Sequence, residues 1–223
     1  RGNVVNPDDV VNKYGADSFR LYEMFMGPLD KSKPWSTKGL QGCYRFTKKI
    51  WKLFTEDETK IVDKEPSKET TMILHQTIKK VTNDLENLSF NTAVSQMMIF
   101  VNHMLSQEHY NKDVLNSFLI ILNPFAPHLS EELNEMIFSD YYCPLSEKKW
   151  PIYDESLIVS DSITIAVQIN GKTRGTINIE PNLGEEDIYD QIINSENFNK
   201  FICDKNIVRK IYVPNKIVNI VVT

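Results

Sequence analysis

The sequence has 223 residues, 41% of them hydrophobic and 25% charged, which is ordinary globular material and enough for one large domain or two smaller ones. No apolar run reaches the roughly 20 residues of a membrane-spanning helix and no charged-then-apolar leader opens the chain, so we expect no membrane association and a cytoplasmic location. The formal net charge of −5 argues against nucleic-acid binding through bulk positive charge, so any such site must be local.

Two short helices are predicted at the start of the chain. Pro7, followed by two aspartates, is a helix-start signal, because proline suits the first helical position and acids complement the positive end of the helix dipole. This helix is expected to end at Gly15. A second one begins at Asp17 and ends before the breaker Gly27-Pro28, and the loop that follows is expected to be anchored by Trp35.

From about residue 38 to residue 137 the apolar residues recur with helical spacing. In two successive segments the spacings alternate between three and four, as on one face of an amphipathic helix: Leu74, Ile78, Val81, Leu85 and Leu88, then Phe90, Val94, Met97, Val101 and Leu105. Two more helices, around 114–122 and 128–137, are separated by prolines that cannot continue a helix. This pattern predicts an antiparallel bundle of four to five helices.

The last region changes to the period of two that is typical of half-buried strands. Apolar residues alternate from Ile163 to Ile169, and Asn170-Gly171 marks a hairpin turn before a return strand that ends at Ile179. A helix that opens with three acidic residues and two further strands complete a small ββαββ domain, with the helix starting at 185–187 and the strands at 207–213 and 217–222.

Two registers of the hairpin are compatible with this turn. A strict two-residue turn sets Lys172 and Arg174 opposite apolar residues of the first strand, on its buried face. A bulge or a three-residue loop frees both cations for solvent and pairs the isoleucines of the two strands, Ile177 with Ile165 and Ile179 with Ile163. We favour the bulged register because it keeps charge off the apolar face.

The patterns together predict a multidomain fold, α followed by α+β. An antiparallel helical bundle is followed by a small ββαββ domain, and a short N-terminal region precedes the bundle. We place the boundaries at residues 1–38, 39–150 and 162–223, with a linker at 151–161.

The sequence shows no pattern that predicts an active site. Cys43, Cys143 and Cys203 form no CxxC pair and have no histidine at ligand spacing, so we expect neither a structural metal nor a disulfide framework. There is also no glycine-rich phosphate loop and no arrangement of a nucleophile with histidine and an acid. We therefore predict no catalytic residue, no metal and no cofactor within this chain.

Two clusters of cations are the candidate binding residues. The first, at spacings i, i+3, i+4 and i+7 on one helix, comprises Arg45, Lys48, Lys49 and Lys52. Such a stripe could meet phosphates, although a solvated face of an amphipathic helix is the favoured interpretation from spacing alone. The second cluster comprises Lys172, Arg174, Arg209, Lys210 and Lys216. If these converge they make a compact phosphate-binding surface, and charged residues that protect sheet edges are an equally compatible interpretation.

Several segments carry a resemblance to a known family. Gly2–Pro7, Tyr14–Asp17 and Arg20–Tyr22 resemble the segment directly after the KMSKS loop of class I aminoacyl-tRNA synthetases. Gly27–Ser36 is similar to the bacterial leucyl-tRNA synthetases and not to their relatives. The same family is indicated by further segments of the bundle and of the last domain: Phe90–Ala93, Phe100–Asn102, Pro124–Leu129, Glu131–Leu133, Val167–Lys172 and Tyr212–Pro214. The chain departs from the family at Asn134, where tryptophan is common.

The resemblance implies a C-terminal fragment of an enzyme that ligates leucine to tRNA(Leu) with ATP and Mg²⁺. The HIGH and KMSKS motifs, the leucine pocket and the editing domain of the family are absent, so the fragment itself is expected to be inactive and to position tRNA for its own upstream catalytic domain. Residues 1–38 resemble the stem-contact region, residues 39–150 the anticodon-binding domain, and residues 162–223 the terminal module that contacts the tRNA elbow. The parent enzyme is expected to be a monomer.

Two alternatives to this interpretation remain open from the sequence. One is a protein-interaction module, which the acidic charge of the chain allows. The other is a part of a related synthetase for valine or isoleucine. The resemblance favours Lys172, Arg174, Arg209 and Lys210 as contacts to RNA phosphates or to the tRNA elbow.

Overall fold

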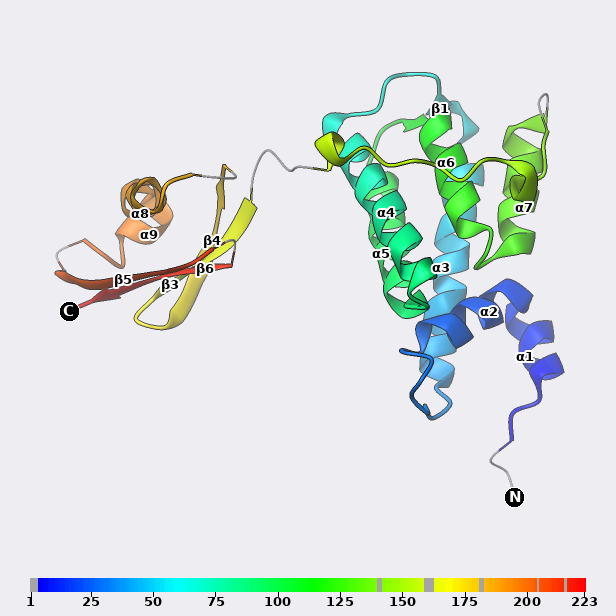
Figure 1. Cartoon of the computed structure of the whole chain (residues 1–223), viewed down its shortest axis with the longest axis horizontal. Helices are drawn as coiled ribbons and strands as arrows, with labels where there is room; N and C mark the ends of the chain where they lie inside the picture. Colours follow the sequence, from blue (N-terminus) through cyan, green and yellow to red (C-terminus); the bar gives the residue numbers. More distant parts are fainter. Residues whose placement is uncertain (1–3, 140–141, 159–162, 181–182, 204, 215) are drawn as a thin grey trace. The chain divides into compact units, whose positions relative to one another are not determined.

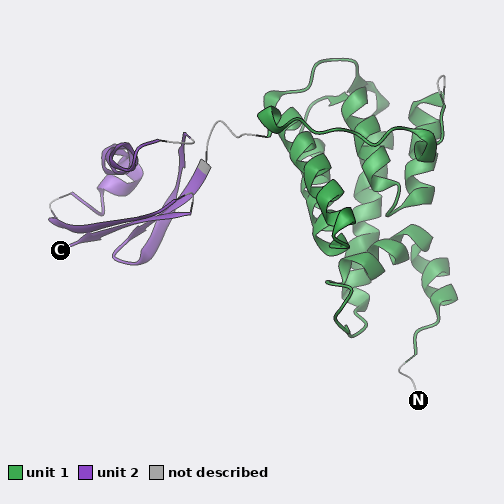
Figure 2. Cartoon of the chain, viewed as in Figure 1, with its two compact units in different colours: residues 1–158 green, residues 159–223 purple. Residues whose placement is uncertain are grey.

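The computed structural model describes residues 4–139, 142–158, 163–180, 183–203, 205–214 and 216–223. The chain forms two compact units, residues 1–158 and 159–223, which we call the helical unit and the sheet unit (Figure 2). The expected order of a helical region followed by a small sheet-containing region is confirmed. Arg1–Asn3, residues 159–161 of the expected linker and Asn215 of the expected last turn lie outside the described residues.

The helical unit is built from seven α-helices in its described part (Figure 1). Helix α4 packs against α5 and α6, and α3 packs against α2, α5 and α7. The strands β1 (Ile61–Val62) and β2 (Tyr110–Asn111) form a short parallel pair. The helices are α1 (Pro7–Tyr14), α2 (Ala16–Phe25), α3 (Thr37–Thr55), α4 (Lys68–Glu86), α5 (Phe90–Leu105), α6 (Lys112–Leu122) and α7 (Pro127–Ile137).

Side-chain caps determine where four of these helices begin. The oxygens of Asn6, Ser36, Ser67 and Asn111 each accept a hydrogen bond from a backbone N–H two or three residues further on, at the starts of α1, α3, α4 and α6. These N–H groups have no partner within their own helix. Between α1 and α2 the chain turns at Gly15, whose φ of 84° is readily adopted only by glycine.

The apolar faces of the helices form one core. Most predicted positions of α4 and α5, such as Leu74 and Val101, are buried, and Leu85 and Phe90 are partly buried against the same core. Phe100 of α5 stacks on Phe118 of α6 with ring centroids 4.8 Å apart. Leu88 differs from the prediction and is 58% exposed. It departs from the helical face because α4 ends at Glu86 and Leu88 has a positive φ of 55°.

A single carboxylate ties the N-terminal helices to α7. Asp17 of α2 is 8% exposed, and its Oδ2 accepts the backbone N–H of Leu129 at 2.6 Å while its Oδ1 lies 2.9 Å from Nδ1 of His128. Both partners lie in the first turn of α7, whose own N-cap residue makes no side-chain bond. Asp17 therefore caps α7 from another helix. On the same side, Arg20 donates to the carbonyl oxygen of Pro124 at 2.9 Å.

Residues 150–158 do not form the linker that was expected from residue 151 onward. This segment, which we call the strap, belongs to the helical unit. Its hydrogen-bond partners on α4 extend from His75 to Thr82, about two turns of the helix, so it lies along α4. The bonded pairs are Trp150–Thr82, Glu155–Lys79, Ile158–Gln76 and Asp154–His75.

Asn134 is a buried polar centre where the resemblance leads one to expect tryptophan. Its Nδ2 donates to the carbonyl oxygen of Cys143 at 2.9 Å, and its Oδ1 accepts from Nζ of Lys148 at 2.7 Å. Lys148 also donates to Oδ1 of Asn116 at 2.8 Å, and burial lowers its pKa below the ordinary value for lysine. These bonds satisfy the buried amide and hold the segment before the strap against α6 and α7.

The sheet unit is a four-stranded sheet with two helices on one side (Figure 1). The strand order is β4-β3-β6-β5, in which β3 and β6 are parallel and the two outer pairs are antiparallel. Alternate residues of the sheet, such as Ile165 and Val218, are buried together with Ile188 and Ile192 of the helix α8. The elements are β3 (Ile163–Ile169), β4 (Lys172–Ile179), α8 (Glu185–Asn194), α9 (Glu196–Asn199), β5 (Ile207–Val213) and β6 (Ile217–Val222).

The β3–β4 hairpin combines features of both predicted registers. Its turn has only two residues, Asn170 and Gly171, with φ of 50° and 74°, and Lys172 stays opposite Ile169. A bulge then makes Arg174 the extra residue of β4. The isoleucines pair as expected beyond the bulge, and both cations are exposed.

We expect Asp17→Ala to lower the free energy of unfolding of the helical unit by about 1–3 kcal/mol, because the partly buried N–H of Leu129 loses its acceptor. Urea unfolding followed by circular dichroism measures this change. Glu23→Ala removes an exposed carboxylate from the same helix and should change the free energy by less than about 0.5 kcal/mol. Equal losses from both substitutions would contradict the capping role.

We also expect the cysteines to differ in reactivity. Cys43 is 0% exposed on the core face of α3, and burial raises the pKa of its thiol to about 11, whereas Cys203 is exposed. Because only the thiolate reacts, a thiol reagent at mildly alkaline pH should label Cys203 rapidly and Cys43 only after unfolding. Peptide mapping after labelling measures this, with Cys203→Ser as the control. Rapid labelling of Cys43 in the native chain would show that the prediction is wrong.

Candidate nucleic-acid interface

The first cation cluster lies along the exposed face of α3. Arg45, Lys48, Lys49 and Lys52 are all exposed, and the opposite face of the helix is buried through Phe46, Ile50, Leu53 and Phe54. We call these four cations the basic stripe. An amphipathic helix of 19 residues therefore presents about two turns of positive charge to solvent.

The members of the basic stripe have different neighbours. Lys49 donates to Oδ1 of Asn102 at 2.7 Å, and Lys52 forms an exposed ion pair with Glu56 at 2.9 Å. Exposed ion pairs of this kind contribute little free energy, so Lys52 can readily exchange Glu56 for another anion. Lys48 lies 5.3 Å from the ring centroid of Tyr44. All four cations are therefore accessible to an anionic partner.

Beside the basic stripe lies a depression that the sequence did not predict. One part, of about 410 Å³, is lined by the α1–α2 corner, α3 and α7, and an adjoining part of about 180 Å³ is lined by α3 and α7. The two parts share Thr47, Trp51 and Leu129, so they form one continuous surface that we call the aromatic groove. Its further lining residues include Tyr14, Ser18, Tyr44, Lys48, His128 and Glu132. The only signal of this groove in the sequence is an aromatic residue, Trp51, directly next to Lys52 of the basic stripe.

The second cation cluster does not converge as expected. Lys172 and Arg174 belong to β4 and Arg209 and Lys210 to β5, and these two strands are the opposite edges of the sheet. Three strand spacings separate the edges, a distance of about 14 Å. Lys216 precedes β6, and its carbonyl oxygen accepts the N–H of Ala166. The strand order is the reason for the difference, because β3 and β6 are inserted between the two edges.

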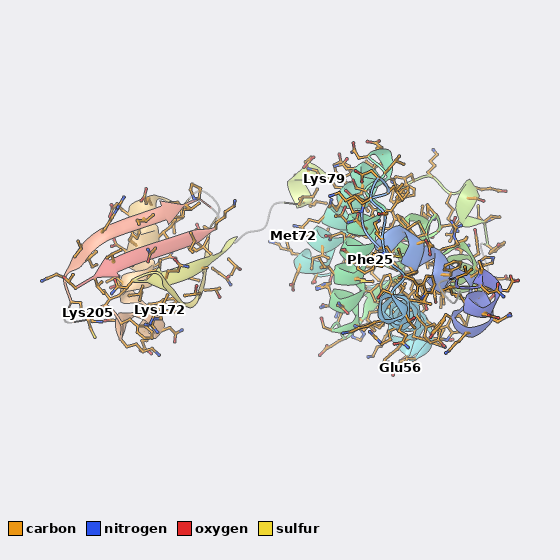
Figure 3. All side chains as sticks on the ribbon, turned by 90° about the horizontal axis from the view of Figure 1, so that it is seen from below. Phe25, Glu56, Met72, Lys79, Lys172 and Lys205 are labelled. Atoms are coloured by element: carbon orange, nitrogen blue, oxygen red, sulfur yellow. The ribbon has the colours of Figure 1, made fainter. Side chains whose placement is uncertain are left out.

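On the β4 edge the two cations have a favourable setting for anion binding. The guanidinium of Arg174 lies 4.5 Å from the ring centroid of Phe201, and Lys200 lies 5.2 Å from the same ring. This stacking orients Arg174 while leaving it exposed. Lys172 is exposed at the start of the strand, and Figure 3 shows it at the periphery of the sheet unit.

The β5 edge differs because one of its cations is engaged within the unit. Lys210 pairs with Glu186 of α8 at 3.1 Å and lies 4.6 Å from the ring centroid of Tyr189. Arg209 is exposed and lies next to a bulge of β5. Burial raises the pKa of Tyr189, whose hydroxyl donates to Glu185. On this edge Arg209 is therefore exposed beside a lysine that Glu186 already engages, so the edge presents less positive charge to a partner than the β4 edge does.

A depression of about 420 Å³ lies at the start of α4. The hydrogen-bonded side chains beside it resemble a catalytic relay, but their role is to cap the helix. The Ser67 hydroxyl donates to Oγ1 of Thr70, which lies 2.9 Å from Nε2 of His103. Ser67 Oγ also accepts the N–H of Thr70, so its position is fixed by capping. Burial lowers the pKa of His103, so the imidazole is largely neutral near pH 7. Only Ser67 and Thr70 of this trio line the depression.

The described residues contain no group of three or more His, Cys, Asp or Glu residues placed to hold a metal ion. In the same part of the chain, no helix combines the length and the apolar character needed to cross a membrane.

Comparison with known protein families gives an assignment for more than half of the chain. The model described as the anticodon-binding domain of tRNA ligase matches residues 67–189. The chain belongs to this family. The matched region begins at the cap of α4, includes α5, α6, α7 and the strap, and continues into α8 of the sheet unit.

Curated relatives of the chain are leucine–tRNA ligases. The chain is 46% identical over 220 residues to the leucine–tRNA ligase of Borreliella burgdorferi (strain ZS7) and also 46% identical to that of Borrelia garinii subsp. bavariensis. Each alignment covers 99% of this chain but 26% of the relative. The chain therefore spans about a quarter of the length of these relatives and aligns with their C-terminal part.

A solved structure has a similar fold. It is the ternary complex of Agrobacterium radiobacter K84 agnB2 LeuRS with tRNA and LeuAMS, to which this chain is 30% identical. The TM-score is 0.69, and the alignment covers 100% of this chain and 30% of the other. At this identity the likeness extends beyond the fold class to the sequence itself.

Proposed function

We propose that the chain is the tRNA-binding C-terminal part of a leucyl-tRNA synthetase, which joins leucine to tRNA(Leu) with ATP. The observation that carries this proposal is the identity of 46% to leucine–tRNA ligases across 99% of the chain. The similar solved structure contains tRNA, which supports RNA as the partner. In the longer enzyme, a cytoplasmic monomer, ATP and Mg²⁺ act in the upstream catalytic domain, and the present chain positions the tRNA.

Each part of the chain has a role in this proposal. Residues 1–38 are the stem-contact region, residues 39–150 the anticodon-binding bundle, and residues 162–223 a C-terminal ββαββ tRNA-binding domain. The terminal domain and the bundle belong to one polypeptide chain. A contact between the terminal domain and the RNA therefore raises the effective concentration of the tRNA at the other sites of the enzyme. Binding energy is thereby used for placement of the acceptor end.

The physical character of the surfaces supports this role. The chain is acidic overall, yet it exposes a basic stripe on α3 and, on the β4 edge, Lys172 and Arg174, of which Arg174 lies over the ring of Phe201. Local cations contact the phosphates and position the RNA, whereas identity comes from its shape and unpaired bases. We propose the basic stripe together with Lys172 and Arg174 as the principal phosphate contacts. Arg209, Lys210 and Lys216 form a separate, weaker contact.

The β4 edge can be tested by charge reversal. We expect Lys172→Glu combined with Arg174→Glu to weaken binding of a tRNA(Leu) transcript about tenfold or more at low salt. The slope of log affinity against log salt should become shallower by about 2, because two phosphate contacts are lost. Fluorescence anisotropy over a salt series measures both quantities, and circular dichroism verifies the fold.

The matched control is Arg209→Glu combined with Lys216→Glu, which changes the charge by the same amount elsewhere on the sheet unit. This variant should lose less affinity than the first. Equal losses from both variants would show that only the net charge of the unit matters. Unchanged affinity in the first variant would remove Lys172 and Arg174 from the interface. Salt-insensitive binding to a protein, with no binding of RNA, would favour an interaction module instead.

We further expect the isolated chain to release no pyrophosphate in the presence of leucine and ATP, because the proposed activation chemistry belongs to the upstream domain. A pyrophosphate-release assay with and without leucine measures this, and a full-length leucyl-tRNA synthetase is the positive control. Leucine-dependent turnover by the 223-residue chain would overturn the proposed division of labour.

A further inference from the structure

The three tryptophans of the chain differ in how their indoles are bonded. The indole N–H of Trp35 donates to Thr37 at 3.1 Å, and that of Trp150 donates to Thr82 at 2.8 Å. Among the described residues the N–H of Trp51 meets no protein acceptor, and its side chain leaves the residue 39% exposed. A large aromatic side chain at the surface does not gain the stabilisation of full burial, so packing in the core does not explain why residue 51 is a tryptophan.

Trp51 forms part of the aromatic groove at its boundary with the basic stripe. It lines both parts of the groove, and Tyr44 lies about two helical turns earlier on the same side of α3. The groove is shallow, with Thr47 and Leu129 shared by its two parts. Its larger part, about 410 Å³, lies within the range of about 300–1,000 Å³ that is usual for small ligands. A flat ring can therefore lie against the indole.

Charge is distributed unequally across the groove. On the α3 side Lys48 lies over Tyr44, and Lys52 follows Trp51 directly. On the α7 side the exposed residue Glu132 is anionic, and His128 is bonded to Asp17 through Nδ1. A bound anion is therefore favoured on the α3 side, whereas an uncharged ring can lie in the groove itself.

This arrangement matches one chemical class of ligand. A nucleotide combines an uncharged aromatic base with an anionic phosphate, and bases stack on exposed aromatic side chains without regard to their sequence. A base in a duplex has both faces stacked already, so only an unpaired nucleotide can use Trp51. The side chains of Lys48 and Lys52 are one turn of α3 apart, about 6 Å along the axis, so they can follow the adjoining phosphates.

We propose that the aromatic groove binds one unpaired nucleotide of the RNA, with its base stacked on Trp51 and its phosphates beside Lys48 and Lys52. The proposal rests on the proposed function and adds a base contact to a surface that otherwise holds only backbone phosphates. Trp51 supplies affinity for unpaired RNA, and the lysines supply the salt dependence.

The test compares Trp51→Ala with Trp51→Phe in the 223-residue chain. We expect Trp51→Ala to weaken binding of a tRNA(Leu) transcript, and of a short single-stranded RNA oligonucleotide, by about fivefold to a hundredfold. The loss should be similar at every salt concentration, because indole carries no charge. Trp51→Phe keeps an aromatic face and should retain most of the affinity. Melting curves by circular dichroism verify that both variants fold.

A second measurement distinguishes stacking from charge. Bound single-stranded RNA should quench part of the tryptophan fluorescence of the unchanged chain, and Trp51→Phe should remove that quenching. Lys48→Ala should make the slope of log affinity against log salt shallower by about 1 while the quenching at saturation persists. A duplex of the same sequence should bind without quenching.

The outcomes separate this proposal from the proposed function. If the unchanged chain and Trp51→Ala bind the tRNA equally well, or if RNA binds without quenching, the nucleotide site is overturned and the tRNA-binding function stands. If the unchanged chain binds no RNA, both are overturned. If Trp51→Ala loses binding of an aromatic peptide but not of RNA, the groove is a protein-docking surface and the proposal is wrong.

Discussion

The arrangement of the helical unit depends on the carboxylate of Asp17. This side chain belongs to α2, yet it satisfies the first turn of α7, which follows it by more than a hundred residues. A buried carboxylate is costly unless it is bonded, and the two partners at the start of α7 meet that requirement. The bond therefore holds the α1–α2 corner against α7. The aromatic groove lies between these two elements and α3, so its shape follows from the same contact.

Much of the fold could be predicted because its determinants are local. Helix-start signals such as Pro7, the periodic apolar faces, and the Asn170-Gly171 turn all act within a few residues of their effect. The capping of α7 by Asp17 has no local signal, because the residue that needs the cap and the residue that supplies it meet only in the folded chain. The strap was mistaken for linker for the same reason: its partners on α4 precede it by about seventy residues or more.

The candidate site shows the same distinction. The basic stripe follows from one helical period, so spacing alone brings its four members together. The cations of the sheet unit depend instead on strand order, which local patterns do not specify. Insertion of β3 and β6 between the edges separates Arg174 from Arg209, and α8 engages Lys210 through Glu186. The sequence did not identify Trp51 as a candidate site residue, because Leu129 and Tyr14, which line the aromatic groove with it, come close to it only in the folded chain.

The parallel pairing of β3 with β6 has a consequence for biosynthesis. The middle of the sheet contains the first and the last strands of the sheet unit, with Ala166 paired to Ile217. A nascent chain that has not yet emerged as far as β6 can form the β3–β4 hairpin, but β5 has no neighbour to pair with. The unit therefore completes its fold only after residue 222 has left the ribosome. A premature stop codon before Ile217 removes a central strand rather than an edge, and leaves the apolar faces of β3 and α8 without the buried side chains of Val218, Ile220 and Val222.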